Sequence, residues 1–308
     1  MKTERAKLTS NIISVLSLMM LLAVSLSCAA KDAIQAAIVM SSSASVYKTV
    51  ANTIEENKKL NVEFTQIDLS ASNFVPDYPS VYITVGTQAF QKLLSERPDS
   101  TIIASFIPRR NYEQLLTQSQ KADTTAIFVD QPMSRQVKLA RLIAPNAKTI
   151  GTVFGESSIE EKKLLYESAN QEGFTILSNN LKEQDNPIGI LQPIITNSDI
   201  FLALPDQSVF NKATAKWSLY ITLHNKKPMI GFSEKYVDAG ALAAVYSTPE
   251  QIGRDTQTAL SNYIENRKLP EAHHPSTFLV KINTASARSL NITIPSEETL
   301  MRKIKGAE

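Results

Sequence analysis

Residues 81–90 read VYITVGTQAF, and this stretch decides the fold class. The β-branched and aromatic run Val81–Val85 predicts a buried strand. Gly86 then turns the chain into an amphipathic helix that we expect over Ala89–Glu96, with room for a close backbone approach at the glycine. A strand that leads straight into a helix is the repeating unit of parallel α/β sheets.

The same unit recurs on both sides of this stretch. Ala36–Met40 predicts a strand, followed by a helix over Val46–Lys59. A second series of strands and helices begins near Thr124 and continues to Ala241–Tyr246, with no long linker before it. We therefore predict an α/β fold with two doubly wound, Rossmann-like lobes around a central cleft.

The expected lobes are each built from two stretches of chain. Residues 33–123 and 240–275 form lobe 1, and residues 124–239 and 276–302 form lobe 2. This division requires three crossings between the lobes. The helix predicted over Thr248–Asn266 would then pack on lobe 1.

The N-terminus predicts an export signal at residues 1–27. A basic segment precedes the apolar run Ile12–Leu26, which at about 15 residues is short for a membrane span of roughly 20. Cys28, the single cysteine, follows this run as in a bacterial lipobox. We expect an exported protein of the periplasm or cell envelope, anchored to the membrane by a lipid on Cys28. Ordinary cleavage after Ala29 or Ala30, which would release a free protein, is the alternative.

Charge and composition exclude several classes of protein. The chain has 308 residues, 43% hydrophobic and 20% charged, so it has enough apolar residues to fold. Its formal net charge of +2 comes from the N-terminal segment, because basic and acidic residues balance in the rest. A neutral body does not favour nucleic-acid binding. We expect a monomer that binds no nucleic acid.

Signatures of catalysis are missing from the sequence. It contains no Gly-x-Ser-x-Gly elbow, no Walker-type loop and no Gly-x-Gly-x-x-Gly after a strand. Of its 3 histidines, His273 and His274 lie in a proline-bounded connection without other clustered metal ligands. We expect a binding protein, not an enzyme, with no cofactor and no metal.

Polar residues gather where predicted strands end. Ligands of open parallel sheets bind beyond the carboxyl ends of the strands, where helix N-termini also offer amides. Helix capping is the alternative role for several of these side chains, because Ser, Thr and Asp are preferred caps. The predicted ligand-binding residues are Ser41, Ser42, Ser43, Thr87, Gln88, Gln131, Asp206, Ser233 and Tyr246.

Two of these residues suggest the chemistry of the solute. The carboxylate of Asp206 opposite the ring of Tyr246 would suit an amine-bearing solute with an apolar part, such as an amino acid. The alternative is that Asp206 caps a helix over Gln207–His224 and that Tyr246 fills the core between the lobes.

Several segments resemble one protein family. Residues 145–154 (PNAKTIGTVF), 203–209 (ALPDQSV) and 239–244 (AGALAA, followed by QIGR) are similar to bacterial ABC-transporter substrate-binding proteins. The similar proteins are those with a type I periplasmic-binding fold, a group that includes tryptophan- and tyrosine-binding members. INTASA at 282–287 continues the resemblance. Asn291 replaces a family glycine, and asparagine tolerates the left-handed conformation that this position needs.

The resemblance implies a function. It suggests the solute-binding component of an ABC importer, which captures a small molecule between the lobes and delivers it to permease and ATPase subunits. The alternative is a ligand-binding sensor or interaction module on the same fold that is not coupled to transport. The sequence does not decide between these roles.

Overall fold

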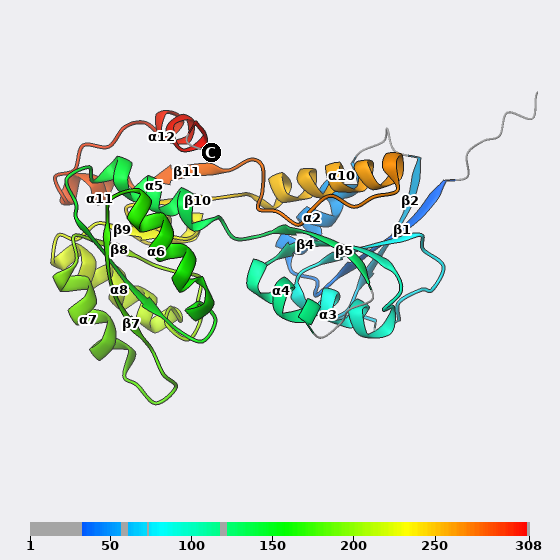
Figure 1. Cartoon of the computed structure of the whole chain (residues 1–308), viewed down its shortest axis with the longest axis horizontal. Helices are drawn as coiled ribbons and strands as arrows, with labels where there is room; N and C mark the ends of the chain where they lie inside the picture. Colours follow the sequence, from blue (N-terminus) through cyan, green and yellow to red (C-terminus); the bar gives the residue numbers. More distant parts are fainter. Residues whose placement is uncertain (1–32, 57–60, 73, 118–121, 307–308) are drawn as a thin grey trace, which may run out of the picture.

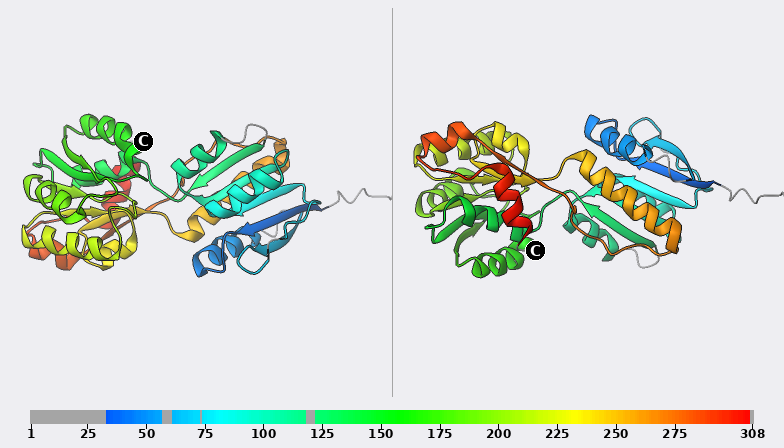
Figure 2. Two further views of the ribbon diagram at one scale, coloured as in Figure 1. Left: turned by 90° about the horizontal axis from the view of Figure 1, so that it is seen from below. Right: turned by 90° about the horizontal axis from the view of Figure 1, so that it is seen from above.

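The computed structural model describes residues 33–56, 61–72, 74–117 and 122–306. They form two lobes that lie side by side and are joined by a narrow waist (Figures 1 and 2). Each lobe has its own sheet, as predicted. Residues 1–27, predicted as an export signal, and Cys28 lie outside the described residues.

Lobe 1 is a parallel sheet with strand order β2-β1-β3-β4-β5. Helices α2 and α10 cover one face and α3 and α4 cover the other (Figure 1). The strands are β1 (Ile34–Met40), β2 (Val62–Asp68), β3 (Val81–Val85), β4 (Thr101–Ile107) and β5 (Asp123–Phe128). The helices are α2 (Ser45–Glu55), α3 (Thr87–Glu96), α4 (Arg109–Thr117) and α10 (Pro249–Asn266).

Lobe 2 has the strand order β11-β10-β9-β8-β6-β7, parallel except at the β10–β11 pair. Its strands are β6 (Thr149–Phe154), β7 (Thr175–Asn180), β8 (Ile200–Leu202), β9 (Met229–Gly231), β10 (Ala243–Tyr246) and β11 (Leu279–Ile282). Its helices are α5 (Met133–Ile143), η1 (Ile159–Glu161), α6 (Lys162–Gln171), α7 (Pro187–Asn197), α8 (Lys212–His224), α9 (Glu234–Asp238), α11 (Thr284–Ser289) and α12 (Glu297–Lys305).

Packing around the second sheet forms two layers. Apolar side chains of α5, α6 and α12 fill one face of the sheet, and those of α7 and of the segment before α8 fill the other. The buried runs of β6 and β8 lie between the layers, which is why they read as continuous apolar stretches.

Sheet pairing moves two expected boundaries of the lobes. We expected lobe 2 to begin near Thr124, but β5 pairs with β4 and completes the first sheet. We expected the chain to return to lobe 1 near residue 240, but β10 pairs with β9 and β11 in the second sheet. The return therefore comes at Pro249, where α10 begins and packs on lobe 1 as expected.

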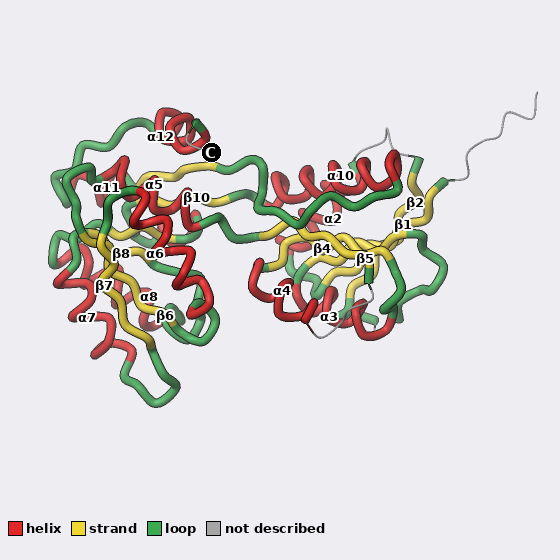
Figure 3. Tube along the Cα trace, viewed as in Figure 1, coloured by secondary structure: helices red, strands yellow, loops and turns green. Residues whose placement is uncertain are grey.

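The lobes are connected by three segments without helix or strand, after β5, after β10 and before β11 (Figure 3). Near the first of them, β4 has a register irregularity beside Phe106, whose φ is +54°. The irregularity ends regular pairing where the chain turns towards Pro108 and α4.

Candidate functional site

A cavity of about 480 Å³ lies between the lobes, at the carboxyl ends of strands from both sheets. Lobe 1 contributes the start of α4, and lobe 2 contributes the loops after β6, β8 and β9. The segment that leads from β5 into α5 forms the wall between them. Lining residues include Asn111, Met133, Ser158, Leu204, Pro205 and Phe232. The wall combines apolar surface with a few polar groups, which is the usual composition of a small-molecule site.

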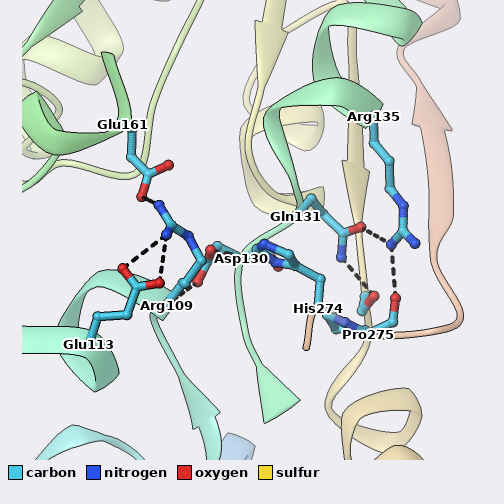
Figure 4. A network of polar contacts seen from close by, with 9 residues as sticks. Arg109, Glu113, Asp130, Gln131, Arg135, Glu161, His274 and Pro275 are labelled. Carbon is cyan, nitrogen blue, oxygen red and sulfur yellow. Dashed lines mark hydrogen bonds and ion pairs between the residues drawn. The ribbon is translucent and has the colours of Figure 1, made fainter. Parts of the chain in front are cut away.

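Two ion pairs cross the cavity from one lobe to the other. Arg109 Nη2 lies 2.6 Å from Glu161 Oε1, and Arg110 Nε lies 3.2 Å from Glu160 Oε2. The guanidinium of Arg109 also binds both carboxylate oxygens of Glu113, at 2.7 and 2.9 Å (Figure 4). Arg109 is thus held between a carboxylate of its own lobe and one of the opposite lobe.

Burial shapes the charges of this cluster. Desolvation opposes the charge of Arg109, but Glu161 and Glu113 outweigh it and raise the pKa of Arg109. The Glu161 side chain is 14% exposed, and burial raises its pKa above the ordinary value even though Arg109 acts against the shift. Burial likewise raises the pKa of Asp130, which accepts a hydrogen bond from the Arg109 amide at 2.8 Å.

Gln136 is a cavity-lining residue with a buried carboxamide oxygen, Oε1, that has no partner among the described residues. It lies on α5 and is 2% exposed. A buried polar atom without a partner is costly. A solute that donates a hydrogen bond to this oxygen would remove the penalty.

The segments that connect the lobes are tied to one another by hydrogen bonds. Gln131 Nε2 donates to Ser247 Oγ at 2.8 Å, and Ser247 Oγ donates to the Thr277 carbonyl at 2.6 Å. Arg135 Nη1 donates to Gln131 Oε1 and to the Pro275 carbonyl, each at 2.9 Å (Figure 4). The three segments of the waist, which we call the hinge, are therefore cross-linked to one another.

His274 extends this network to the cavity. Its Nδ1 lies 2.9 Å from the carbonyl oxygen of Asp130 and 3.7 Å from Asp130 Oδ2 (Figure 4). The neighbouring His273 instead bridges the edge of lobe 1 through its backbone, opposite Ile127. In the described part of the chain, no group of His, Cys, Asp or Glu is arranged to hold a metal ion.

Among the predicted ligand-binding residues, Gln131 and Ser233 line the cavity. Gln131 is buried, and both polar atoms of its carboxamide are engaged in the hydrogen bonds of the waist. Ser233 follows β9 and its side chain accepts a hydrogen bond from the Tyr236 amide, which makes it the N-cap of α9. Ser233 therefore both caps a helix and borders the cavity.

The predicted residues of lobe 1 lie near the end of β3, beside the cavity but not in its lining. Ser41 is buried, and its Oγ accepts a hydrogen bond from the Ala89 amide at 3.0 Å. Thr87 Oγ1 accepts one from the Asn111 side chain at 3.2 Å, and Asn111 lines the cavity. Ser42 is partly exposed, whereas Ser43 and Gln88 are exposed. Their role in binding stays a prediction.

Asp206 lies behind the cavity wall. It is 2% exposed, and its carboxylate accepts hydrogen bonds from Ser158 Oγ at 2.8 Å and from the Ser208 amide and hydroxyl at 2.9 and 2.6 Å. Desolvation acts to raise the pKa of Asp206, but these hydrogen bonds outweigh it and hold the pKa below its usual value. In this arrangement Asp206 positions Ser158, which lines the cavity.

Tyr246 lies at the end of β10, opposite Leu279 of β11. Burial, with a contribution from Glu234, raises the pKa of its phenol. It lies outside the cavity lining, so a direct contact with solute stays a prediction.

Sequence reasoning missed the charged residues that cross the cavity and the carboxamide of Gln136. A signal for the arginines was present: Arg109 and Arg110 come one residue after the strand that ends at Ile107. Gln136 gave no such signal, because it lies inside a helix whose other buried residues, apart from Arg135, are apolar. No helix within the described ranges has both the length and the apolarity to cross a lipid bilayer.

Comparisons with known proteins agree on the fold. A model of the family described as "ABC transporter substrate binding protein" matches residues 54–304. A conserved domain protein from Vibrio cholerae is 21% identical, with a TM-score of 0.61 over 88% of this chain and 98% of that one. A Streptococcus pneumoniae ABC domain in complex with L-Trp is 19% identical, with a TM-score of 0.61 over 87% and 97%.

A third solved structure is also similar. It is a ligand-free, open substrate-binding protein with adhesive properties from Clostridium difficile, 16% identical, with a TM-score of 0.68 over 86% of this chain and 97% of that one. Among curated proteins, none matches this chain. At these identities the solved structures establish the two-lobed fold and nothing about the solute.

Proposed function

This chain belongs to the ABC transporter substrate-binding protein family, and on that premise we propose that it captures a small solute in the interlobe cavity for an ABC importer. The observation that carries the proposal is a cavity that both lobes line and that is bordered by Gln136, whose buried carboxamide oxygen has no partner among the described residues. Solute binding would satisfy this oxygen and exclude water from the cavity.

The chemistry of the cavity suggests an amino acid with an apolar side chain. Phe232, Met133 and Leu204 offer apolar surface. In the guanidinium of Arg110, Nε is the one nitrogen that has a hydrogen-bond partner among the described residues. Its two terminal nitrogens are therefore available to a carboxylate of the solute. The Gln136 oxygen would accept a hydrogen bond from the ammonium group. This assignment replaces Asp206 with Gln136 as the group that receives the amine.

Solute capture requires the lobes to move about the hinge. Closure around a ligand is a hinge motion for which loop segments between lobes are suited. The cross-links among Gln131, Ser247 and Thr277 keep the connecting segments together, so we expect them to move as a unit. The ion pairs of Arg109 and Arg110 already connect the two lobes at the cavity, so we expect them to favour the closed state.

Delivery of the solute would need partners outside this chain. We propose a permease and an ATPase, and attachment to the membrane through lipid on Cys28, as the family and the N-terminal pattern suggest. A Cys28→Ser variant should then move from the membrane to the soluble fraction. Unchanged membrane partitioning would contradict lipid attachment. A sensor on the same fold is the alternative function, and loss of solute uptake on deletion of the gene would argue against it.

A thermal-shift screen tests solute binding directly. We expect an amino acid with an apolar side chain to stabilise the protein, by about 2.7 kcal/mol at a hundredfold excess over the dissociation constant. Gln136→Leu should abolish most of this stabilisation. The free variant should be at least as stable as the parent, because an unpartnered polar atom is removed from a buried position.

The matched control is Gln88→Leu, the same change at an exposed predicted residue outside the cavity lining. It should leave solute affinity unchanged. If Gln136→Leu binds as tightly as the parent while Gln88→Leu does not, the site lies at the end of β3 and our assignment is wrong. If no class of amino acid, sugar, nucleoside or peptide stabilises the protein after endogenous solute is stripped, the solute-binding proposal itself fails.

A further inference from the structure

Helix α8 presents its polar and apolar residues in an unusual way. Its buried positions are hydroxyl residues one turn apart, Thr214, Ser218 and Thr222. Tyr220 and Leu223 are 65% and 45% exposed. A helix on the surface of a globular protein normally turns its apolar stripe inward and its polar residues outward.

Two of the three inward hydroxyl groups donate hydrogen bonds to backbone carbonyls of α8 or of the loop before it. Thr214 Oγ1 donates to the Val209 carbonyl at 2.6 Å, and Thr222 Oγ1 donates to the Ser218 carbonyl at 2.8 Å. These local bonds let α8 lie on the sheet without burying a full apolar stripe. Of its larger apolar residues, Trp217, Leu219 and Ile221 are partly buried against the core of lobe 2, whereas Tyr220 and Leu223 are exposed.

Partly exposed and exposed apolar residues of α8 form the floor of a groove of about 780 Å³ between α8 and α9, which we call the α8–α9 groove. Ala215, Leu219 and Leu223 follow one another at intervals of four residues and line it. Over eight residues this stripe runs for about 12 Å along the helix. Its lining shares no residue with the interlobe cavity. The groove is thus a separate surface of lobe 2.

Positive charge surrounds this groove on two sides. Lys212 and Lys216 come from α8, and Lys235 comes from α9. All three are exposed, and none has an ion pair with any other described residue. By contrast, the partly exposed Lys281 on the same lobe is paired with Glu234 and Asp238. The unpaired lysines favour an occupant that carries negative charge.

Tyr236 supplies a hydrogen-bonding group at the wall of the groove. It lines the groove, and its hydroxyl is buried without a hydrogen-bond partner among the described residues. Burial raises the pKa of the phenol, so the group stays a donor at neutral pH. A donor among lysines suits a carboxylate.

We propose that the α8–α9 groove binds an acidic amphipathic helix of a protein partner. Side chains spaced by four residues form the ridges that pack into grooves between helices, and amphipathic helices commonly dock into apolar grooves through such spacing. The surface is concave and open at Tyr220 and Leu223, which suits a convex helix better than a flat membrane or an enclosed small molecule. Acidic residues beside the apolar stripe of the partner would meet Lys212, Lys216 and Lys235.

A second copy of this chain fits the groove poorly. The described helix with the largest exposed apolar residues after α8 is α6, which exposes Leu164 and Tyr166. That helix also begins with Lys162 and Lys163. Glu167 of the same helix pairs with Lys163 at 3.9 Å, so α6 offers no net negative charge to the lysines of the groove.

The test uses the whole protein and three labelled helical peptides of one length. The first has leucines on one face and flanking glutamates, the second has lysines in place of the glutamates, and the third is a scramble of the first. Fluorescence anisotropy measures their binding. Two variants remove the proposed contacts, Lys212→Glu/Lys216→Glu/Lys235→Glu and Leu223→Ser. All the substituted side chains are exposed, and melting temperature checks the fold.

Charge reversal should invert the choice of peptide. We expect the parent to bind the acidic peptide and the triple variant to bind it roughly tenfold more weakly or worse, while gaining affinity for the basic peptide. Leu223→Ser should weaken the binding of the acidic peptide and of the basic peptide, because it removes apolar contact surface that both would use. The control, Lys163→Glu/Lys182→Glu/Lys303→Glu, reverses three exposed lysines elsewhere on lobe 2 and should bind like the parent.

Other results would overturn the proposal. One is that the parent binds the scrambled peptide as tightly as the acidic peptide. The other is that the triple lysine variant binds the acidic peptide as tightly as the parent does. Binding of vesicles of phosphatidylcholine and phosphatidylglycerol that is lost in the triple variant, without peptide binding, would assign the surface to a membrane. Self-association that Leu223→Ser abolishes, seen by light scattering, would assign it to a second copy.

Discussion

Gly86 is the position where a single methyl group should cost lobe 1 the most. Its φ of +92° and ψ of 167° lie in a region that is essentially restricted to glycine. A Cβ at this position would lie 2.7 Å from Ser41 Oγ and 3.1 Å from the ring of Tyr47. Gly86→Ala therefore combines backbone strain with a steric clash.

The magnitude follows from these two effects. Holding a non-glycine residue in this backbone region costs about 1–3 kcal/mol. Displacing Ser41 would also break its hydrogen bond to the Ala89 amide, worth about 1 kcal/mol. We expect Gly86→Ala to lower the free energy of unfolding by about 2–4 kcal/mol in total. The loss should fall on lobe 1, where β1, β3 and α3 meet.

Urea denaturation measures this loss, with circular dichroism reporting both lobes and the single tryptophan, Trp217, reporting lobe 2. The control is Gly189→Ala on α7, where a Cβ would find its nearest atom at 3.9 Å. That change should be neutral or stabilising by up to about 1 kcal/mol. A Gly86→Ala protein as stable as the parent would refute the assigned strain.

Two further predictions concern the carboxylates at the cavity. Asp206→Asn should lower the free energy of unfolding at pH 7 by about 1–3 kcal/mol, with solute affinity largely intact, as calorimetry would show. Because the pKa of Asp206 is lowered in the folded protein, its carboxylate stabilises the fold above about pH 4. This stabilisation of the fold is lost as the pH falls through the folded pKa. Asp206→Asn should not show that loss of stability in acid. The pKa of Glu161 is raised, so the parent should lose stability as pH rises from about 4.5 through the folded pKa. Glu161→Gln should flatten that decline in a series of melting temperatures, and a variant with the same pH profile as the parent would contradict the assignment.

The sequence predicted several strands well because a run of a few β-branched and aromatic residues is enough to indicate a buried strand. Val81–Val85 has the bounds that the sequence predicts, and the strand predicted over Ala36–Met40 lies within β1 and ends with it. The predicted left-handed conformation of Asn291 is confirmed by its φ of +56°. The helix expected over Gln207–His224 begins only at Lys212, because Asp206 binds Ser208 in a turn and Asn211 is the N-cap. Antiparallel β11 gave no signal, since its four residues alternate weakly.

The candidate site was harder to predict because it depends on contacts between the lobes. Ser233 could be found from its place after a strand. Glu161 follows a loop in lobe 2, and only the placement of the lobes brings it to Arg109. Which polar group is left without a partner, as at Gln136, follows from the complete packing around α5. Strand ends predict where a site lies, whereas tertiary contacts decide which side chains are available in it.

The late position of α10 in the chain bears on how the protein is made. Ile252, Ala259 and Leu260 of α10 close the core over β1, β3 and α2, so this face of lobe 1 lacks its cover until residue 260 has been synthesised. Lobe 2 needs Leu300 and Ile304 of α12 for its own core. Neither lobe can complete its packing early in translation. A nascent chain that has not yet reached these helices has two open cores, and a polypeptide with open cores can still be threaded through a narrow translocation channel.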